Sequence, residues 1–548
     1  MKIKIIIPIM LLISTIACKK QLDITNTNQP TPESAASEAG VISLAQGSIY
    51  RNGFFDLKYT DGVYGRFWAG ATGFHEMMGD VIGVEAANAF INQIGCPNKV
   101  TYDNASVILN PSAVNTQYAL LRSVNFNSQS GGNPTFYEWA YMYGLIVAAN
   151  TTLDLSSKAT YTGSAAAKAA KKATIDAWCY WWKGYAYSRI GSIYYAGIKQ
   201  DATYSASSTN GNYISNTAIL AEADANFTKC DAALTAASAS AADFSTVFAQ
   251  LVPGYCQIGK GGVLTVPMWK RNISTMRARN IMVNTLQAAI TPAQWSSILT
   301  LTNSGIQASD FIFTGRTDPN GDFLGTTVAD KVQSTSSATN TYKLSERWVQ
   351  DFKSGDQRLA NNVRTLNAGV GIFNQDRGNS FNTRYTLRNG GLALPGVVTY
   401  SNTIAGANEI SLCGTYEENE LMKAEATMYA ASFSPASIVT GMGLVDAVRN
   451  YQGAGLAPTV ALTAVVAREE LRRERRIALG FKGLSFYDAR RWDIIDPTKS
   501  RTGCVLLSAS SVVNTNAIIN YGFLDYWDVP DNELAYNPAT SGVVKNPK

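Results

Sequence analysis

Histidine is almost absent from this sequence: His75 is the single one among 548 residues. One imidazole excludes zinc sites built on two histidines and proton relays with more than one ring. Charged residues are also scarce, at 16% against roughly 25% in ordinary soluble proteins. The net charge is only +5 and no long basic block occurs, so nothing indicates nucleic-acid binding. Hydrophobic residues nevertheless make up 46%, which excludes a mainly disordered chain and predicts a globular core.

The sequence also lacks most short catalytic motifs. It has no GxSxG nucleophile elbow and no pair of cysteines at CxxC spacing. Gly254 to Lys260 match the spacing of a phosphate-binding loop, but Gly261 follows where that loop needs a Ser or Thr to bind Mg²⁺. Carboxylates are numerous, so counting alone does not decide against a glycosidase pair. Disulfides and free thiols both remain open for the cysteines after Cys18, namely Cys96, Cys179, Cys230, Cys256, Cys413 and Cys504.

The N-terminal residues are typical of an exported lipoprotein. The uncharged stretch Ile5 to Ala17 follows a positive start and is shorter than the roughly 20 apolar residues of a membrane-spanning helix. A lipoprotein signal peptide over residues 1–17 fits this pattern. The residues before Cys18 resemble a lipoprotein cleavage site, although Thr15 stands where Leu is more usual. We therefore expect acyl chains on Cys18, which would hold the protein at a membrane surface.

The rest of the chain divides into a tether and one folded domain. Residues 18–38 are polar and contain two prolines, which predicts a lipidated tether. Residues 39–548 are expected to form a single domain. Its N-terminal part, 39–330, holds helical repeats and variable loops. Its C-terminal part, 331–548, holds the segments that resemble a family signature.

Apolar residues at helical spacing recur along most of this domain. The spacing predicts long helices from Phe136 onwards, over about 164–195 and over about 216–238. Such pairs with short polar breaks are typical of tetratricopeptide-like hairpins with a degenerate repeat. Residues 239–415 are irregular, and we interpret them either as a loose insertion or as a binding surface on a helical scaffold. Alternation over Thr383–Leu392 predicts a small β-hairpin. Further helices are predicted at 33–51, 276–290, 345–353, 416–432, 440–452 and 461–479.

Four segments, in order, resemble the signature of one protein family. Glu474-Arg475-Arg476, then Gly483, then Asp488-Ala489-Arg490-Arg491-Trp492 are similar to the C-terminal signature of the SusD/RagB-like outer-membrane lipoproteins. With the N-terminal cysteine, the resemblance covers essentially the whole mature chain. The three further segments are Leu344-Ser345-Glu346 with Phe352, Asp356 and Arg358; Glu420 to Ala426 with Val448-Arg449 and Gly453-Ala454-Gly455; and Trp527 to Leu534 with Asn537-Pro538.

This resemblance implies a mostly α-helical fold, a right-handed superhelix of four tetratricopeptide-like helix pairs with a loop-rich variable region. It implies a non-catalytic binding lipoprotein without a cofactor, anchored in the outer membrane and facing outside. Its partner would be a SusC-like TonB-dependent transporter, and its ligand an oligosaccharide or, less often, a peptide. The alternatives are a secreted glycosidase, which would release reducing sugar, and a helical-repeat scaffold without a small ligand.

Two departures from the family pattern lie within the C-terminal signature. Lys482 stands where the family usually has Glu, and Ser485 stands where it often has Arg, so the packing around Gly483 should differ here. We interpret the signature itself as structural. Arginines and carboxylates over 474–492 predict a buried, bidentate ion-pair network that locks the last helices together.

The chemistry of sugars suggests which residues contact the ligand. A sugar ring has an apolar face that packs on an aromatic ring, and the Gly-rich residues 52–135 hold aromatic residues without helical spacing. We expect exposed rings in loops to form the site, with Arg66, His75 and Asp80 nearby; core packing is the alternative. The aromatic residues from Trp178 to Tyr195 stand at helical spacing and are assigned to the core. The candidate ligand-binding residues are Tyr64, Phe67, Trp68, Phe74 and Trp269.

Overall fold

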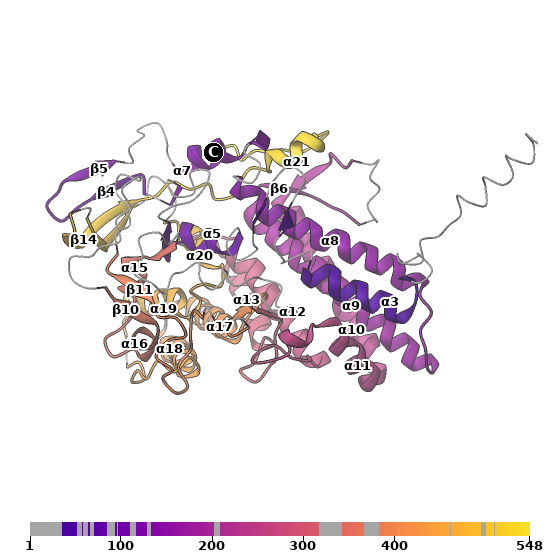
Figure 1. Cartoon of the computed structure of the whole chain (residues 1–548). Helices are drawn as coiled ribbons and strands as arrows, with labels where there is room; N and C mark the ends of the chain where they lie inside the picture. Colours follow the sequence, from indigo (N-terminus) through magenta and orange to yellow (C-terminus); the bar gives the residue numbers. More distant parts are fainter. Residues whose placement is uncertain are drawn as a thin grey trace, which may run out of the picture.

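The computed structural model describes most of the chain (Figure 1). The signal peptide, Cys18, Arg66, Phe67, Trp68 and Cys96 lie outside the described residues. The described residues are 35–51, 57–58, 64–65, 71–84, 94–95, 97–109, 117–128, 133–201, 209–316, 342–366, 383–402, 404, 406–460, 462–494, 500–508 and 510–548.

Long helices form the right-hand part of the molecule in Figure 1. Their starts are set by capping side chains: Ser164 accepts a hydrogen bond from the backbone N–H of Ala167, and Thr265 accepts one from Met268. α9 packs against both α8 and α10, as expected for a helix that is apolar around most of its circumference. These helices are α3 (Glu38–Gln46), α8 (Pro134–Lys158), α9 (Ala165–Ile193), α10 (Asn216–Ala237), α11 (Ala241–Leu251), α12 (Val266–Val283) and α13 (Pro292–Asn303).

Aromatic rings fill the core of this part. Trp178, Trp181 and Trp182 of α9 are fully buried. The ring of Phe313 lies 4.2 Å from that of Trp181 and 5.5 Å from that of Trp269, measured between centroids. Edge and tilted geometries dominate, which is the arrangement that aromatic quadrupoles favour. The assignment of these α9 rings to the core is thus confirmed.

The helix pairs continue into the C-terminal part. α13 packs against α17, and Trp295 stacks on Tyr429 with a centroid distance of 4.7 Å. The mostly helical fold with packed helix pairs is thereby confirmed. The C-terminal helices are α15 (Glu346–Val349), α16 (Gln357–Asn362), α17 (Tyr416–Ala430), α18 (Pro435–Tyr451), α19 (Ala464–Ala478), α20 (Ser485–Arg491) and α21 (Asp531–Tyr536).

Strands in the described part of the chain form small antiparallel sheets. The largest has the order β13-β14-β4-β5 and joins β13 (Arg501–Leu507) and β14 (Val513–Asn520) to β4 (Lys99–Thr101) and β5 (Val107–Leu109). The predicted strand near Thr383 exists as β11 (Tyr385–Leu387), but it pairs with β10 (Val363–Thr365) rather than within a local hairpin. The remaining pairs are β1 (Leu57–Lys58) with β2 (Tyr64–Gly65), β3 (Ile82–Val84) with β9 (Tyr342–Leu344), β6 (Ala196–Ile198) with β7 (Tyr213–Ser215), and β8 (Thr314–Arg316) with β12 (Glu409–Ser411).

The irregular middle is more regular than its sequence suggests. Residues 241–303 hold α11, α12 and α13, so this stretch continues the helical scaffold instead of forming a loose insertion. The helix expected at 276–290 begins ten residues earlier, at Val266, because Thr265 caps it and Pro267 occupies its first turn.

Five cysteines lie in the described part of the chain, and all are buried: Cys179, Cys230, Cys256, Cys413 and Cys504. Of these, Cys179, Cys230, Cys413 and Cys504 are free thiols. No helix of the described residues is both long enough and apolar enough to cross a membrane.

A buried network of arginines and carboxylates holds the C-terminal part together, as predicted. Arg358 donates to Glu474 at 2.6 Å and to Asp356 at 2.8 Å. Asp488 accepts from Arg491 at 2.6 Å and from Arg475 at 2.9 Å. All of these side chains are at least 95% buried. Their pairing locks α16, α19 and α20 into one unit.

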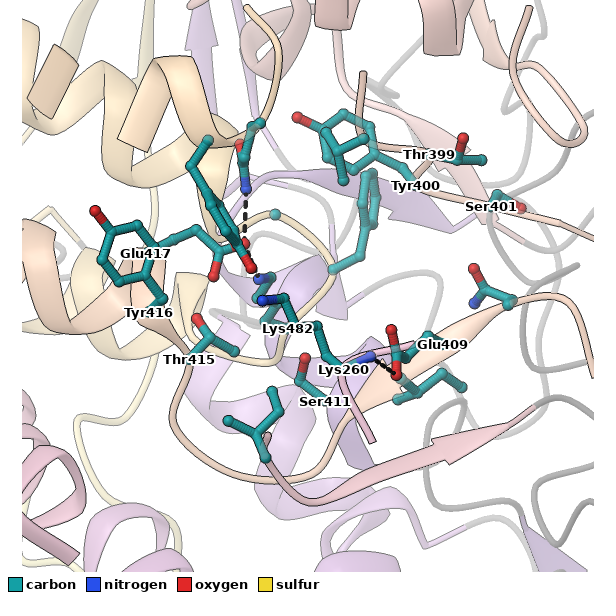
Figure 2. A pocket seen from close by; sticks show the side chains of 18 of the residues that line it. Lys260, Thr399, Tyr400, Ser401, Glu409, Ser411, Thr415, Tyr416, Glu417 and Lys482 are labelled. Carbon is teal, nitrogen blue, oxygen red and sulfur yellow. Dashed lines mark hydrogen bonds and ion pairs between the residues drawn. The ribbon is translucent and has the colours of Figure 1, made fainter. Parts of the chain in front are cut away.

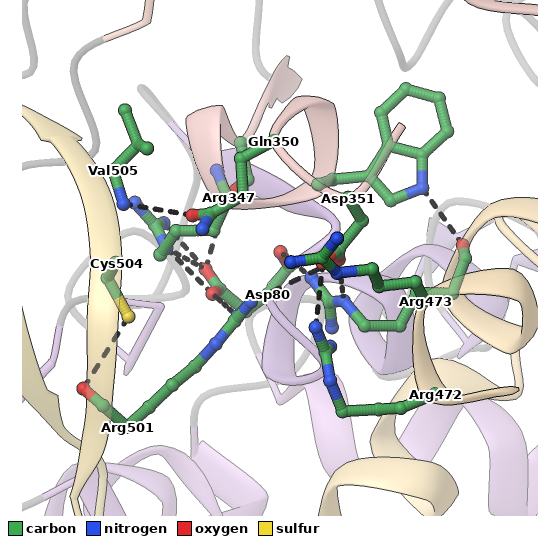
Figure 3. Close-up of polar contacts among 12 residues, drawn as sticks. Asp80, Arg347, Gln350, Asp351, Arg472, Arg473, Arg501, Cys504 and Val505 are labelled. Carbon is green, nitrogen blue, oxygen red and sulfur yellow. Dashed lines mark hydrogen bonds and ion pairs between the residues drawn. The ribbon is translucent and has the colours of Figure 1, made fainter. Parts of the chain in front are cut away.

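A second cluster of ion pairs joins this unit to the N-terminal region (Figure 3). Asp80 accepts from Arg347 at 2.6 Å and from Arg501 at 2.9 Å, and Asp351 accepts from Arg476 at 2.6 Å. Burial alone would raise the pKa of Asp80, but the neighbouring guanidinium groups, Arg347 first, hold it below its usual range. Asp80 is thus a structural residue and does not lie at the rim of a ligand site.

Candidate functional site

Two of the predicted ligand-binding rings are in the core. Phe74 is 2% exposed and packs edge-on against Trp527 at 5.2 Å, while Trp269 is fully buried among Trp178, Phe248 and Phe313. The prediction of exposed rings is therefore wrong for Phe74 and Trp269. Both belong to helices, α5 (Gly73–Met78) and α12, whose apolar faces pack inward.

The other candidate rings stay predictions. Tyr64 lies in the two-residue strand β2, and Phe67 and Trp68 fall outside the described residues. His75 is fully buried, and its Nε2 lies 2.6 Å from the Glu138 carboxylate. Burial lowers the pKa of His75, while the Glu138 carboxylate opposes that shift. This histidine is a packing residue.

A different cavity, of about 520 Å³, lies where the helical scaffold meets the C-terminal part (Figure 2). We call it the junction cleft. Its walls come from the loop before α12, from the β8–β12 ladder, from residues 396–402, from the start of α17, and from the residues at the ends of α18 and α19. Side chains that line it include Lys260, Tyr400, Glu409, Tyr416, Tyr451 and Lys482.

Aromatic rings form two walls of the junction cleft. Tyr416 and Tyr451, at the start of α17 and the end of α18, meet edge to face with centroids 4.8 Å apart. Tyr400 and Phe481 lie 5.6 Å apart on another wall. All four rings are partly buried, and burial raises the pKa of the Tyr416 hydroxyl, so it stays a neutral hydrogen-bonding group.

An ion pair with an amide forms a polar patch in the cleft. Lys482 Nζ donates to Glu417 Oε1 at 3.0 Å, and Gln452 Nε2 donates to the same oxygen at 3.1 Å. Burial alone would raise the pKa of Glu417, but Lys482 holds it below its ordinary value. Lys482, which departs from the family pattern, thus has a partner on α17. Ser485, the second departure, donates its hydroxyl to the carbonyl oxygen of His75.

The side chain of Glu409 binds to the end of the segment that has the spacing of a phosphate-binding loop. Its Oε1 accepts the backbone N–H groups of Lys260 and Gly261 at 2.8 and 2.9 Å, and a nitrogen of Arg316 at 3.0 Å. Consecutive N–H groups that converge in this way form an anion-binding nest. A side chain of the protein already fills it, so the segment does not bind nucleotide phosphates.

A buried carboxylate fixes one wall of the junction cleft from behind. Glu76 of α5 accepts backbone N–H groups from Phe481 at 3.1 Å, from Gly483 at 2.6 Å and from Leu484 at 3.2 Å. The turn can present these groups because Phe481 and Gly483 both have positive φ values, +65° and +72°. The sequence around Glu76 does not indicate this role, because its hydrogen-bond partners are backbone groups more than 400 residues away.

The chemistry available in the cleft is that of recognition. Aromatic edges and faces alternate with carboxylate, amide, hydroxyl and ammonium groups, which suits a ligand with apolar faces and many hydroxyls. Among the described residues no group of histidines, cysteines and carboxylates could hold a metal ion. A second hollow of about 540 Å³ runs along α8, but its lining, such as Leu44, Phe136 and Val147, is mainly apolar.

No protein-family model matches the sequence, and no curated protein matches it. Solved structures do match. A SusD-like carbohydrate-binding protein from Bacteroides fragilis NCTC 9343 superposes with a TM-score of 0.55 at 14% identity, over 92% of this chain and 99% of that chain. A SusD superfamily protein from Parabacteroides distasonis ATCC 8503 gives 0.54 at 12% identity, over 93% and 98%. A structure determined with a xylogluco-oligosaccharide gives 0.50 at 13% identity, over 93% and 99%.

At identities this low, the likeness is one of architecture. It extends over more than nine-tenths of both chains in each of these comparisons. The chain, with its packed helix pairs and small antiparallel sheets, therefore has the SusD-like fold.

Proposed function

We propose that this protein is a non-catalytic, lipid-anchored binding protein that captures an oligosaccharide in the junction cleft. It then delivers the oligosaccharide to a SusC-like TonB-dependent transporter in the outer membrane. The single observation that carries the glycan-binding part is the lining of the cleft, where partly buried tyrosines alternate with oriented polar groups. The SusD-like fold supports the same conclusion, since solved proteins of this fold are described as carbohydrate-binding.

The carboxylates of the cleft are arranged for binding and not for hydrolysis. A glycosidase needs one carboxylic acid with a raised pKa to protonate the leaving group. The pKa of Glu417 is instead lowered by Lys482, and Glu409 is engaged by two backbone N–H groups and Arg316. Neither side chain is available as a general acid.

Capture and delivery require only modest affinity. Two or three rings that each contribute about 1 kcal/mol give near 3 kcal/mol before hydrogen bonds. A dissociation constant in the millimolar to micromolar range, roughly −4 to −8 kcal/mol, is then expected. Such a ligand can be handed on to a transporter.

The lipid anchor is proposed from the N-terminal sequence. Acyl chains on Cys18 would keep the domain at the outer membrane, facing outside, and the polar residues that follow would give it reach. A Cys18→Ala protein should lose the acyl group and appear in the soluble fraction or as uncleaved precursor. Unchanged membrane retention with normal cleavage before residue 18 would disprove the anchor.

A glycan array tests the binding function. Wild type should bind at least one glycan of the array. Tyr451→Ala should weaken that binding several-fold because it removes a ring from the cleft wall. Tyr536→Ala is the matched control, since Tyr536 is 70% exposed on α21 outside the cleft. Peptides on a parallel array test the less frequent ligand class. Equal glycan binding by Tyr451→Ala and wild type would remove the junction cleft as the site.

Association with the transporter needs a separate measurement. Affinity purification of the protein from outer membranes should recover a TonB-dependent transporter in stoichiometric amounts. Recovery of the protein alone, under conditions that keep membrane complexes intact, would argue against delivery.

A further inference from the structure

We propose that the junction cleft selects glycans that carry a carboxylate, such as uronic-acid oligosaccharides, and that Lys260 is the residue that recognises this group. The inference rests on the proposed function, because it assumes that the cleft binds a glycan. It goes further by assigning the chemical class of the ligand and the side chain that decides it.

Most ionic side chains that line the cleft are already neutralised by a partner. Arg316 lies 3.0 Å from Glu409, and Lys482 lies 3.0 Å from Glu417. The remaining carboxylate, Asp310, is 2.6 Å from Arg271 of α12. These pairs present no net charge to a ligand.

Lys260 is different. Its ammonium group donates to the carbonyl oxygen of Ala308 at 2.5 Å and lies 5.0 Å from the centre of the Tyr451 ring. Within the described ranges its ammonium forms no ion pair, and Glu409 accepts the backbone N–H of Lys260. An ammonium has three donors, and these contacts use one of them.

The position of this charge matches the aromatic wall. Lys260 lies over Tyr451, which meets Tyr416 edge to face, and all three line the cleft (Figure 2 labels Lys260 and Tyr416). A sugar ring held against these tyrosines would bring a carboxylate at its rim within reach of the ammonium. The pair so formed would be partly buried, where charge-assisted hydrogen bonds are stronger than in water. A neutral sugar would leave the ammonium without a counter-ion.

The experiment compares matched glycans and matched lysines. The probes are an array of neutral and carboxylated oligosaccharides, including an oligogalacturonide and its methyl ester, which differ only in the carboxylate. Lys260→Met keeps the length of the side chain, and the Glu409 nest, which uses backbone N–H groups, stays intact. Lys229→Met is the control, since Lys229 also lies over a tyrosine ring, Tyr180 at 5.7 Å, but outside the cleft.

Wild type and Lys229→Met should bind carboxylated glycans at least tenfold more tightly than their neutral partners. Lys260→Met should lose that preference at an unchanged melting temperature, and Lys260→Arg should restore part of it. Added NaCl should weaken the binding of carboxylated glycans by wild type and leave Lys260→Met nearly unaffected, because salt screens a partly exposed ion pair.

The remaining outcomes separate the two proposals. Binding of neutral glycans alone, weakened by Tyr451→Ala, would overturn the carboxylate preference and leave the proposed function standing. Equal binding of carboxylated glycans by Lys260→Met and wild type would overturn the role of Lys260. If no glycan binds at all, both the carboxylate preference and the proposed function fall.

Discussion

Around α9, aromatic rings pack against aromatic rings; around α19 and α20, guanidinium groups pair with carboxylates. Both regions are almost completely buried. The aromatic core is held by contact area, which tolerates changes that keep the volume. The ionic region is held by complementarity of charge, and removal of one partner leaves the other buried and uncompensated. Equal burial therefore does not mean equal tolerance to substitution.

The largest effect should come from breaking the ionic region. Asp488→Ala leaves Arg475 buried without its carboxylate, because Asp488 is the carboxylate it bonds to. Loss of one partner of a buried pair costs about 3–5 kcal/mol. Urea denaturation should show this decrease in the free energy of unfolding. A decrease in the free energy of unfolding below about 1 kcal/mol would mean that water screens this ion pair.

A change in the aromatic core that keeps a large apolar side chain should cost less. Phe313→Leu removes ring contacts with Trp181, Trp182 and Trp269 but leaves a side chain that can fill most of the space. We expect a loss of about 1–3 kcal/mol. The same denaturation measurement checks it. A loss as large as that of Asp488→Ala would remove the distinction between the two regions.

Glu76 is a third kind of buried group, because it has no cationic partner among the described ion pairs. Burial raises its pKa from 4.5 to about 7, against the backbone N–H groups of Phe481, Gly483 and Leu484. The folded state therefore binds this proton more tightly than the unfolded state. That contribution to stability is complete below pH 4.5 and is lost as the pH rises through about 7.

The stability of wild type relative to Glu76→Gln should accordingly fall between pH 4.5 and 7. Chemical denaturation at several pH values measures this difference. A constant difference across the window would show that the three N–H groups keep Glu76 ionised throughout.

The smallest effect should come from an ion pair at the surface. Lys158 and Asp154 lie 2.7 Å apart on the last turns of α8, with side chains 60% and 42% exposed. Such a pair contributes about 0.5 kcal/mol or less. Asp154→Asn should leave the denaturation midpoint nearly unchanged, which makes it the control for Asp488→Ala. A decrease in the free energy of unfolding above about 1 kcal/mol would show that the exposed fraction of two side chains does not predict how much their ion pair stabilises the fold.

Sequence reasoning succeeded where the signal is local or where residue types are fixed. The helical period located α9, α10, α17 and α19 to within a few residues, and the Arg- and Glu-rich signature predicted the buried network around Asp488. It gave no sign of the β13–β14 hairpin, whose strands include polar residues on both faces. It also missed α11 and α13, which lie in a stretch rich in Ser, Thr and Asn.

The candidate site was the least predictable part. Phe74 lies in a Gly-rich stretch and Trp269 in an irregular one, which favours exposed rings, but tertiary packing covers both. The junction cleft is assembled from residues between 260 and 482, which no local pattern connects. In the sequence, Lys260 stands out only as part of a segment with phosphate-loop spacing. Only the folded arrangement, with Glu409 in the nest, shows that its ammonium faces the cleft.

The contacts between the end of the chain and the first long helices have a consequence for the order of folding. Trp527 donates its backbone N–H to Ile193, Asp528 pairs with Arg122, and Asn532 accepts from Asn133, nearly 400 residues earlier. Contacts so distant along the chain close late and slowly. The part of the surface around Ile193 and Asn133 that residues 527–532 cover therefore stays exposed until these residues have docked. A chain interrupted before that point would expose apolar surface and be an early target for proteases, so completion of synthesis is coupled to survival of the product.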